Sequence, residues 1–168
     1  MTTLILTVAG ADRPGLVAAV AEVVEAHGGN WENSQLSELA GVFAGVIEIS
    51  VPDDRTEGLQ SALRELDGLL TVDVRTGTPD NPESSDRITL SVLGNDRPGI
   101  VREVSGVLSD HSLSIESMTT ETRDAAMAGG RLFESTVTAT APASADLDDL
   151  RADLERIADE IQVDITLE

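Results

Sequence analysis

One stretch of the sequence occurs twice, and this repeat constrains the fold more than any other feature. Residues 6–17, LTVAGADRPGLV, return at residues 90–101 as LSVLGNDRPGIV, so that equivalent residues lie 84 positions apart. The same spacing relates His27 to His111, whereas Phe43 and Phe133 lie 90 positions apart, which gives the second copy six additional residues. Such a repeat indicates two copies of one structural unit. We therefore predict two small domains of similar design within the 168 residues.

The limits of the two domains follow from the repeat and from a polar segment between the copies. Residues 78–86 contain two prolines and mostly polar side chains, a composition that suits neither a helix nor a central strand. We predict a first domain at residues 1–78, a linker at 79–87 and a second domain at 88–168. The six additional residues fall within residues 123–130, where we expect the tip of a hairpin.

Each copy predicts the same order of strands and helices. A first strand is followed by a turn at Gly10 or Gly94, and then by a helix with Pro14 or Pro98 in its first turn, where proline is favoured. A hairpin of two strands, a second helix and a strand of alternating apolar residues complete the copy. Ser144 is the expected N-cap of the last helix. The expected strands are residues 3–9, 30–37, 42–51 and 70–74 in the first copy and 87–93, 114–122, 131–141 and 161–167 in the second.

The order β-α-β-β-α-β predicts the fold class. It indicates an α+β protein made of two ferredoxin-like units, each with an antiparallel sheet and both helices on one face. Such a sheet leaves its other face and its edges in need of cover, which association between copies can supply.

Charge and composition exclude several classes of function. The 31 acidic and 11 basic residues, all of the latter arginine, give a formal net charge of −20, which repels nucleic acid and anionic lipid. We therefore expect no direct nucleic-acid binding and no membrane binding. The absence of cysteine excludes thiolate chemistry and cysteine-based metal sites. The N-terminal residues do not resemble a signal peptide, so we expect a cytoplasmic protein. We also expect no metal and no other cofactor.

The duplicated Asp-Arg-Pro-Gly turn offers a corner suited to an amino acid. Gly15 and Gly99 lack a Cβ atom, so a ligand carboxylate can approach the free N–H groups at the start of the following helix. Asp12 and Asp96 can accept hydrogen bonds from the ligand's ammonium group. The same aspartates can instead cap their helices, and this alternative stays open.

This order of elements, with Gly-x-Asp-Arg-Pro-Gly after the first strand of each copy, resembles the ACT domain over nearly the whole chain. ACT domains are regulatory modules that commonly bind amino acids at interfaces between domains, and a free-standing pair resembles the glycine cleavage system transcriptional repressor family. The resemblance implies an amino-acid ligand such as glycine or serine, a homodimer, and a protein partner such as a transcription factor. It also implies that a polar residue at the start of the second strand completes each site. The candidate ligand-binding residues are Asp12, Arg13, Pro14, Gly15, Leu16, Asn30, Asp96, Arg97, Pro98, Gly99, Ile100 and Ser114.

Three functions compete for such a chain. We favour an amino-acid-sensing regulatory protein over a ligand-free interaction scaffold, and an enzyme on a ferredoxin-like fold is third, because the chain lacks Cys, Lys, Tyr and a recognisable catalytic motif. Of the two corners we favour the one with Asp12, Gly15 and Asn30, since the Asn30 amide can both donate and accept hydrogen bonds. The site should lie where a turn faces the second strand of a neighbouring unit, because a single turn does not enclose a ligand.

Overall fold

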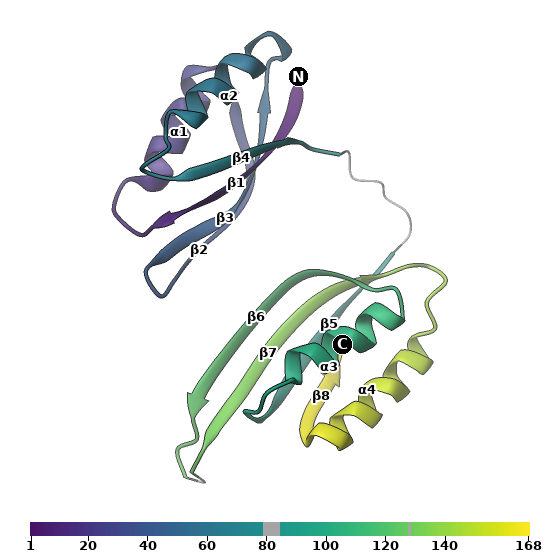
Figure 1. The fold of residues 1–168 in the computed structure, drawn as a ribbon. Helices are drawn as coiled ribbons and strands as arrows, with labels where there is room; N and C mark the ends of the chain where they lie inside the picture. The colour runs from purple at the N-terminus through teal and green to yellow at the C-terminus, as the bar shows by residue number, and fades with distance from the viewer. Residues whose placement is uncertain (79–84, 128) are drawn as a thin grey trace. The chain divides into compact units, whose positions relative to one another are not determined.

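Both copies of the repeat fold in the order strand, helix, strand, strand, helix, strand (Figure 1). The computed structural model describes residues 1–78, 85–127 and 129–168. The chain separates into two units between residues 80 and 81, called unit 1 and unit 2 below. Most of the linker predicted at residues 79–87 lies outside the described residues, while Asp86 and Arg87 already belong to a strand. The domain limits given above therefore stay predictions.

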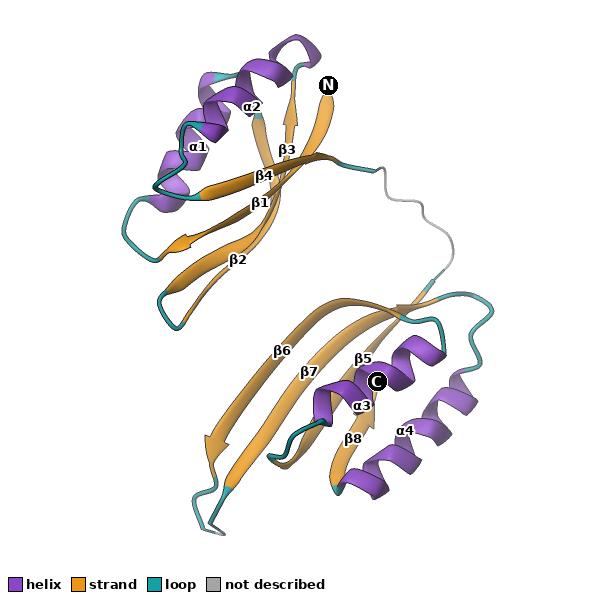
Figure 2. Cartoon of the chain, viewed as in Figure 1, coloured by secondary structure: helices purple, strands orange, loops and turns teal. Residues whose placement is uncertain are grey.

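Unit 1 is a four-stranded antiparallel sheet with the strand order β2-β3-β1-β4, and both of its helices cover one face (Figure 2). Every second residue of a strand shares a face, so Leu4, Leu6 and Val8 pack beneath the helices and are fully buried or nearly so. The elements are β1 (Thr2–Ala11), α1 (Leu16–Ala26), β2 (Asn30–Leu39), β3 (Val42–Val51), the short 3-10 helix η1 (Asp53–Arg55), α2 (Thr56–Arg64) and β4 (Thr71–Thr76).

Unit 2 has the equivalent strand order β6-β7-β5-β8, again antiparallel and again with both helices on one face. Its core contains residues equivalent to those of unit 1 and several more, with Leu90 of the first strand and Leu108 of the first helix completely buried. The elements are β5 (Asp86–Asn95), α3 (Ile100–Asp110), β6 (Ser114–Asp124), β7 (Arg131–Ala141), α4 (Leu147–Ile161) and β8 (Val163–Leu167). The predicted fold class is thus confirmed for both units.

Four local predictions were wrong. The last strand of unit 2 begins at Val163 and not at residue 161, because Ile161 still belongs to α4. Gly10 and Gly94 belong to strands β1 and β5 and not to the turns that follow. Pro14 and Pro98 precede the helices instead of occupying their first turns, since α1 and α3 begin two residues later, each after an N-cap glycine. The N-cap of α4 is Asp146 and not Ser144, because the Asp146 carboxylate accepts hydrogen bonds from two N–H groups of the first helical turn at 3.0 and 3.1 Å.

The units differ in the hairpin between their second and third strands and in the length of the second helix. The β2–β3 hairpin turns at Ala40 and Gly41, whereas residues 125–130 join β6 to β7, and residue 128 of the predicted hairpin tip lies outside the described residues. The second helix has 9 residues in unit 1 and 15 in unit 2. In the described residues, no helix combines the length and the apolar character that crossing a membrane requires.

Candidate functional site

The backbone of the duplicated turn has the same conformation in both units. Gly15 has φ 91° and ψ 2°, and Gly99 has φ 98° and ψ −7°, so each adopts the left-handed conformation immediately before its helix. The Gly15 carbonyl oxygen accepts a hydrogen bond from the Ala19 N–H group at 3.0 Å, and that of Gly99 accepts one from Glu103 at 2.9 Å. Both glycines are therefore N-caps without a side chain. Glycine is favoured here by the left-handed backbone conformation.

The starts of α1 and α3 are consequently uncapped. The first N–H groups of an α-helix have no intrahelical partner, and no side chain of the described residues caps either helix. The alternative in which Asp12 and Asp96 cap the helices is therefore not found. Their backbones are fixed instead by the adjoining hairpins, because the Asp12 N–H group donates to the Gly41 carbonyl at 2.9 Å and that of Asp96 donates to Arg131 at 2.8 Å. Both aspartates are exposed.

Asn30 and Ser114 do not lie near the turn of their own unit. Asn30 is opposite Ser50 of β3, and Ser50 is opposite Thr3 at the start of β1, whereas the turn follows the end of β1. A strand rises about 3.3 Å per residue, so roughly 25 Å separates Asn30 from the turn along the sheet. The register of unit 2 gives Ser114 the same position. Within one unit, neither residue forms a single site with the turn.

Asn30 has a local partner that the sequence analysis did not single out. Its Nδ2 donates to Glu32 Oε1 at 3.0 Å, and Ser50 Oγ donates to the same oxygen at 2.5 Å. The Ser50 bond, followed by the Asn30 bond, stabilises the carboxylate and holds the pKa of Glu32 below its usual range. Glu32 lies at a β-bulge, and its equivalent in unit 2, Glu116, forms a salt bridge with Arg87 at 2.8 Å.

In unit 2, the turn borders a hollow of about 490 Å³ on the β7 side of β5. The hollow brings together four of the predicted residues, with the uncapped start of α3 at its edge and an apolar wall from Phe133 of β7. Ser114 and Pro98 do not line it. The lining residues are Asp96, Arg97, Gly99, Ile100, Val101, Arg102, Thr122 and Phe133.

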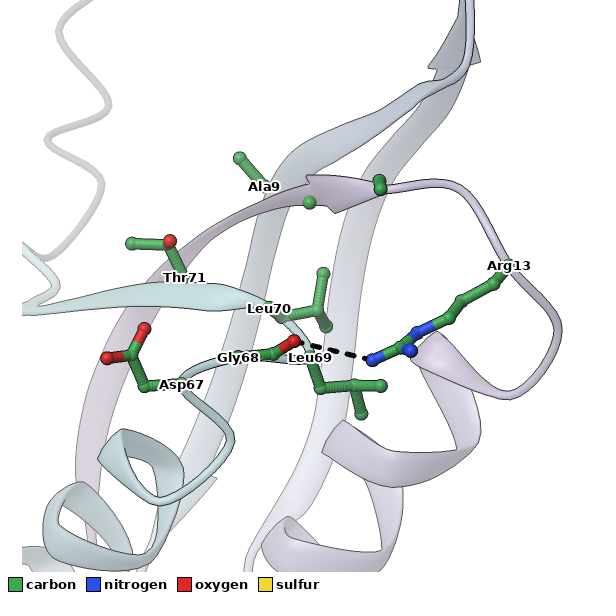
Figure 3. Close-up of a pocket in the computed structure, with 9 residues that line it drawn as sticks. Ala9, Arg13, Asp67, Gly68, Leu69, Leu70 and Thr71 are labelled. Atoms are coloured by element: carbon green, nitrogen blue, oxygen red, sulfur yellow. Dashed lines mark hydrogen bonds between the residues drawn. The ribbon is translucent and has the colours of Figure 1, made fainter.

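In unit 1, a hollow of about 400 Å³ borders the turn on the β4 side of β1 (Figure 3). Arg13 extends from the turn and donates from Nη2 to the Gly68 carbonyl oxygen at 3.5 Å. The other lining residues are Ala9, Gly10, Ala11 and residues 67–71, and the predicted residues Asp12, Pro14, Gly15 and Leu16 are not among them. The arginine of the duplicated turn thus lines hollows on different sides of the first strand in the two units.

The two histidines have local partners at the ends of the first helices, where the sequence places them. His27 Nδ1 bonds to the Val23 carbonyl oxygen at 2.8 Å. His111 Nε2 lies 2.8 Å from Asp153 Oδ2 on α4, and this hydrogen bond is the main reason why the pKa of Asp153 is lowered. Each histidine therefore contacts residues of its own unit.

Comparison with known protein families assigns both units to the same kind of domain. An ACT-domain model matches residues 2–76, and a second ACT-domain model matches residues 88–155. The chain belongs to the ACT-domain family. Two ACT domains in tandem therefore account for the repeat, and unit 1 and unit 2 are the first and the second of them.

Relatives of this ACT-domain protein include the glycine cleavage system transcriptional repressor of Escherichia coli (strain K12). It is 29% identical over 147 residues, which cover 85% of this chain and 77% of that protein. The repressor of the same name from Shigella flexneri matches equally, at 29% identity over 147 residues. Among solved structures, an unknown protein from Galdieria sulphuraria has a TM-score of 0.90 at 29% identity, covering 99% of this chain and 97% of that one.

Proposed function

We propose that this tandem ACT-domain protein is an amino-acid-sensing regulator that acts through a protein partner in the cytoplasm, and that it is not an enzyme. The ligand is a small amino acid such as glycine or serine, and the partner is a protein such as a transcription factor. One observation carries the proposal: each ACT domain has an uncapped helix start four residues after an exposed aspartate. The similarity of the chain to glycine cleavage system transcriptional repressors supports the regulatory role.

The chemistry of the turn suits a zwitterion. The N–H groups at the start of α1 or α3 attract a carboxylate, because they lack partners and lie at the positive end of the helix dipole. The carboxylate of Asp12 or Asp96 accepts hydrogen bonds from an ammonium group. An amino acid carries both groups on adjacent atoms, so one corner can bind both ends.

A neighbouring ACT domain supplies the second wall of the site. β2 is an edge strand, and it runs in the same direction as β1, because both are antiparallel to β3. Antiparallel pairing of two β2 strands from two chains therefore brings the start of one β2 to the turn end of the other. Asn30 of the partner subunit then reaches the Asp12 corner, although Asn30 and Asp12 of one unit lie far apart. A homodimer follows from this arrangement.

Two exposed valines support the proposed contact with a neighbouring ACT domain. Val17 and Val101 occupy equivalent positions in the first turns of α1 and α3, and they are 42% and 43% exposed. An apolar side chain at the same position of both copies, next to the turn, favours contact with a second surface. Such a surface would also enclose a ligand at the corner.

Calorimetry tests the site. A thermal-shift screen with the twenty amino acids identifies the ligand, since a ligand that binds the native state raises its stability. Asp12→Ala, Asp96→Ala and Asn30→Ala are then compared with the parent protein. Loss of one charge-assisted hydrogen bond weakens binding by about 1.5–3 kcal/mol, roughly ten- to a hundredfold in affinity. If folded Asp12→Ala and Asp96→Ala both bind as tightly as the parent, the turn is not the site.

We infer action through a protein partner, and not through DNA, from the negative net charge of the chain. With a net charge of −20, the protein should form no complex with DNA in a gel-shift assay at low salt. A tight, salt-sensitive shift by the purified protein alone would contradict this part of the proposal.

A ligand-free interaction scaffold is the second candidate, and a group of exposed apolar residues favours it. Leu39, Val42 and Val46 at the β2–β3 hairpin are 79%, 53% and 46% exposed. Leu39 and Val42 lie directly opposite each other and share a face of the sheet. Under this alternative, Val42→Asp abolishes self-association in sedimentation experiments while no amino acid stabilises the parent protein.

A further inference from the structure

One face of the unit 1 sheet is left open by the helices of that unit. Both helices lie on the other face, where Leu4 and Leu6 are buried, so Thr7 and Ala9 of β1 point to the open side (Figure 2). Strand pairing places alternate residues of β2 and β3 on the same side. At the hairpin end of the sheet these positions are every second residue of 7–11, 35–39 and 42–46. We call these nine residues the open face.

The open face is uncharged and partly apolar. Its nine side chains are those of alanine, valine, leucine, serine, threonine and glutamine, whereas residues 1–78 as a whole contain 12 acidic residues and four arginines. Five large apolar side chains are exposed in the described residues of unit 1, and three of them, Leu39, Val42 and Val46, belong to the open face. A contiguous apolar surface of this kind marks a site of interaction.

The equivalent face of unit 2 is charged. The strand registers make Arg123 equivalent to Leu39, and Glu134 equivalent to Ala44. Arg123 and Glu134 form a salt bridge at 3.4 Å between the two strands of the hairpin. The two units share one fold and differ in this surface, so the fold itself does not require an uncharged face.

Charge indicates what covers the open face. Chains with a net charge of −20 repel one another, and a contact between two uncharged faces brings no carboxylate of either face against another. A basic partner would instead gain most at the acidic surfaces of the chain. Sheets with small side chains pack well face to face, at a separation of about 10 Å. A second copy of the same face therefore fits better than a basic protein.

We propose that the open face of unit 1 packs against the open face of a second copy of the chain, so that the two sheets form a sandwich. This contact differs from the pairing of β2 strands described above, because edge pairing extends a sheet in its own plane and face packing stacks two sheets. It requires no amino-acid ligand and is independent of the proposed sensing function. Where both contacts form, the protein is a tetramer.

Sedimentation velocity on the full chain tests the contact. β3 lies between β2 and β1, so Val46→Glu places a carboxylate within the open face. It should raise the dissociation constant of the face contact by roughly a hundredfold, because an unpaired carboxylate is costly to bury. The matched variant Thr136→Glu, at the equivalent position of unit 2, should change it less than twofold. Added salt should strengthen the association of the parent protein, since it screens the repulsion between acidic chains.

Three results would overturn the inference. A parent protein that stays monomeric at all concentrations would refute any contact between copies. Unchanged association in folded Val46→Glu would refute the face contact and leave the β2 pairing standing. Equal loss of association in Val46→Glu and Thr136→Glu would show a general effect of charge.

Two controls keep these outcomes separate. Ala44→Glu is the second variant if Val46→Glu does not fold, because β7 carries Glu134 at the equivalent position of a folded unit. The fluorescence of Trp31, which packs against the core of unit 1, reports whether each variant is folded. The thermal-shift screen with amino acids tests the sensing function by itself. Ligand binding without the face contact would refute only this inference, and the face contact without ligand binding would refute only the sensing function.

Discussion

Replacement of Gly15 by alanine tests the geometry of the duplicated turn. Gly15 has a φ of 91°, and a Cβ atom there would meet no heavy atom within 4 Å. The substitution therefore adds backbone strain without a steric clash, and the strain for an L-residue in the left-handed region is about 1–2 kcal/mol. Gly15→Asn should lose less stability than Gly15→Ala, because asparagine tolerates this conformation better.

Trp31 provides a reporter for unit 1 alone. It is the only tryptophan of the chain and packs against the core of unit 1. For a unit of this size, unfolding in urea has a slope of about 1 kcal/mol per M, so Gly15→Ala should lower the midpoint followed by Trp31 fluorescence by about 1–2 M. Gly99→Ala, with a φ of 98°, is the matched control and should leave that midpoint in place.

The reasoning fails under either of two outcomes. An unchanged Trp31 midpoint in Gly15→Ala would show that the turn carries no conformational strain. Equal losses for Gly15→Ala and Gly15→Asn would show that the loss comes from the side chain and not from the left-handed backbone.

Three further predictions concern stability. Gly10→Ala should destabilise unit 1 by about 1–3 kcal/mol in the Trp31 urea assay, because the added Cβ lies 2.9 Å from the Leu69 carbonyl oxygen; an unchanged midpoint would contradict the close contact. Ser135→Ala should leave the thermal stability of unit 2 unchanged or raise it by about 1 kcal/mol, since the buried Ser135 hydroxyl has no hydrogen-bond partner in the described residues. The pKa of Asp153 is lowered mainly by its hydrogen bond to His111, so this bond stabilises the fold above the unfolded-state pKa and is lost as the pH falls through the folded-state pKa. Unfolding midpoints followed as the pH is lowered below the usual pKa of aspartate should therefore fall less steeply in Asp153→Asn than in the parent.

The fold could be predicted from the sequence because the same order of apolar patterns and turn residues occurs in both copies of the repeat. β3 and β7 have the predicted limits, Val42–Val51 and Arg131–Ala141, since alternating apolar residues and the turn residues around them agree. Gly10 was misassigned to a turn because glycine is a turn residue in most sequences. Its actual role is to admit the Leu69 carbonyl oxygen, a tertiary contact that no local pattern reveals.

The candidate site was less predictable for the same reason. The conformation of Gly15 is local, and the Pro-Gly sequence indicated a helix start within two residues of the true one. The distance between Asn30 and Asp12 depends on how β2, β3 and β1 pair, and the repeated sequence does not reveal this pairing. Arg13 bonds to the Gly68 carbonyl in residues 65–70, the segment between α2 and β4. The second helix is longer in unit 2, so its last strand follows after Gln162 alone. A residue-by-residue match of the two copies therefore describes the backbone of the turn better than its surroundings.

The surroundings of the two turns differ in charge, so the two proposed corners are not equivalent. Glu38 and Thr122 are equivalent, because each lies opposite the phenylalanine of the next strand. Thr122 lines the unit 2 hollow together with two arginines. Glu38 accepts a hydrogen bond from the Gly41 N–H group at 2.6 Å, next to the Asp12 backbone, and so it places a carboxylate on the β3 side of the unit 1 turn. Charges within about 10 Å interact at ordinary ionic strength. A carboxylate bound at the proposed corner would therefore meet an additional like charge, that of Glu38, in unit 1, and two arginines in unit 2.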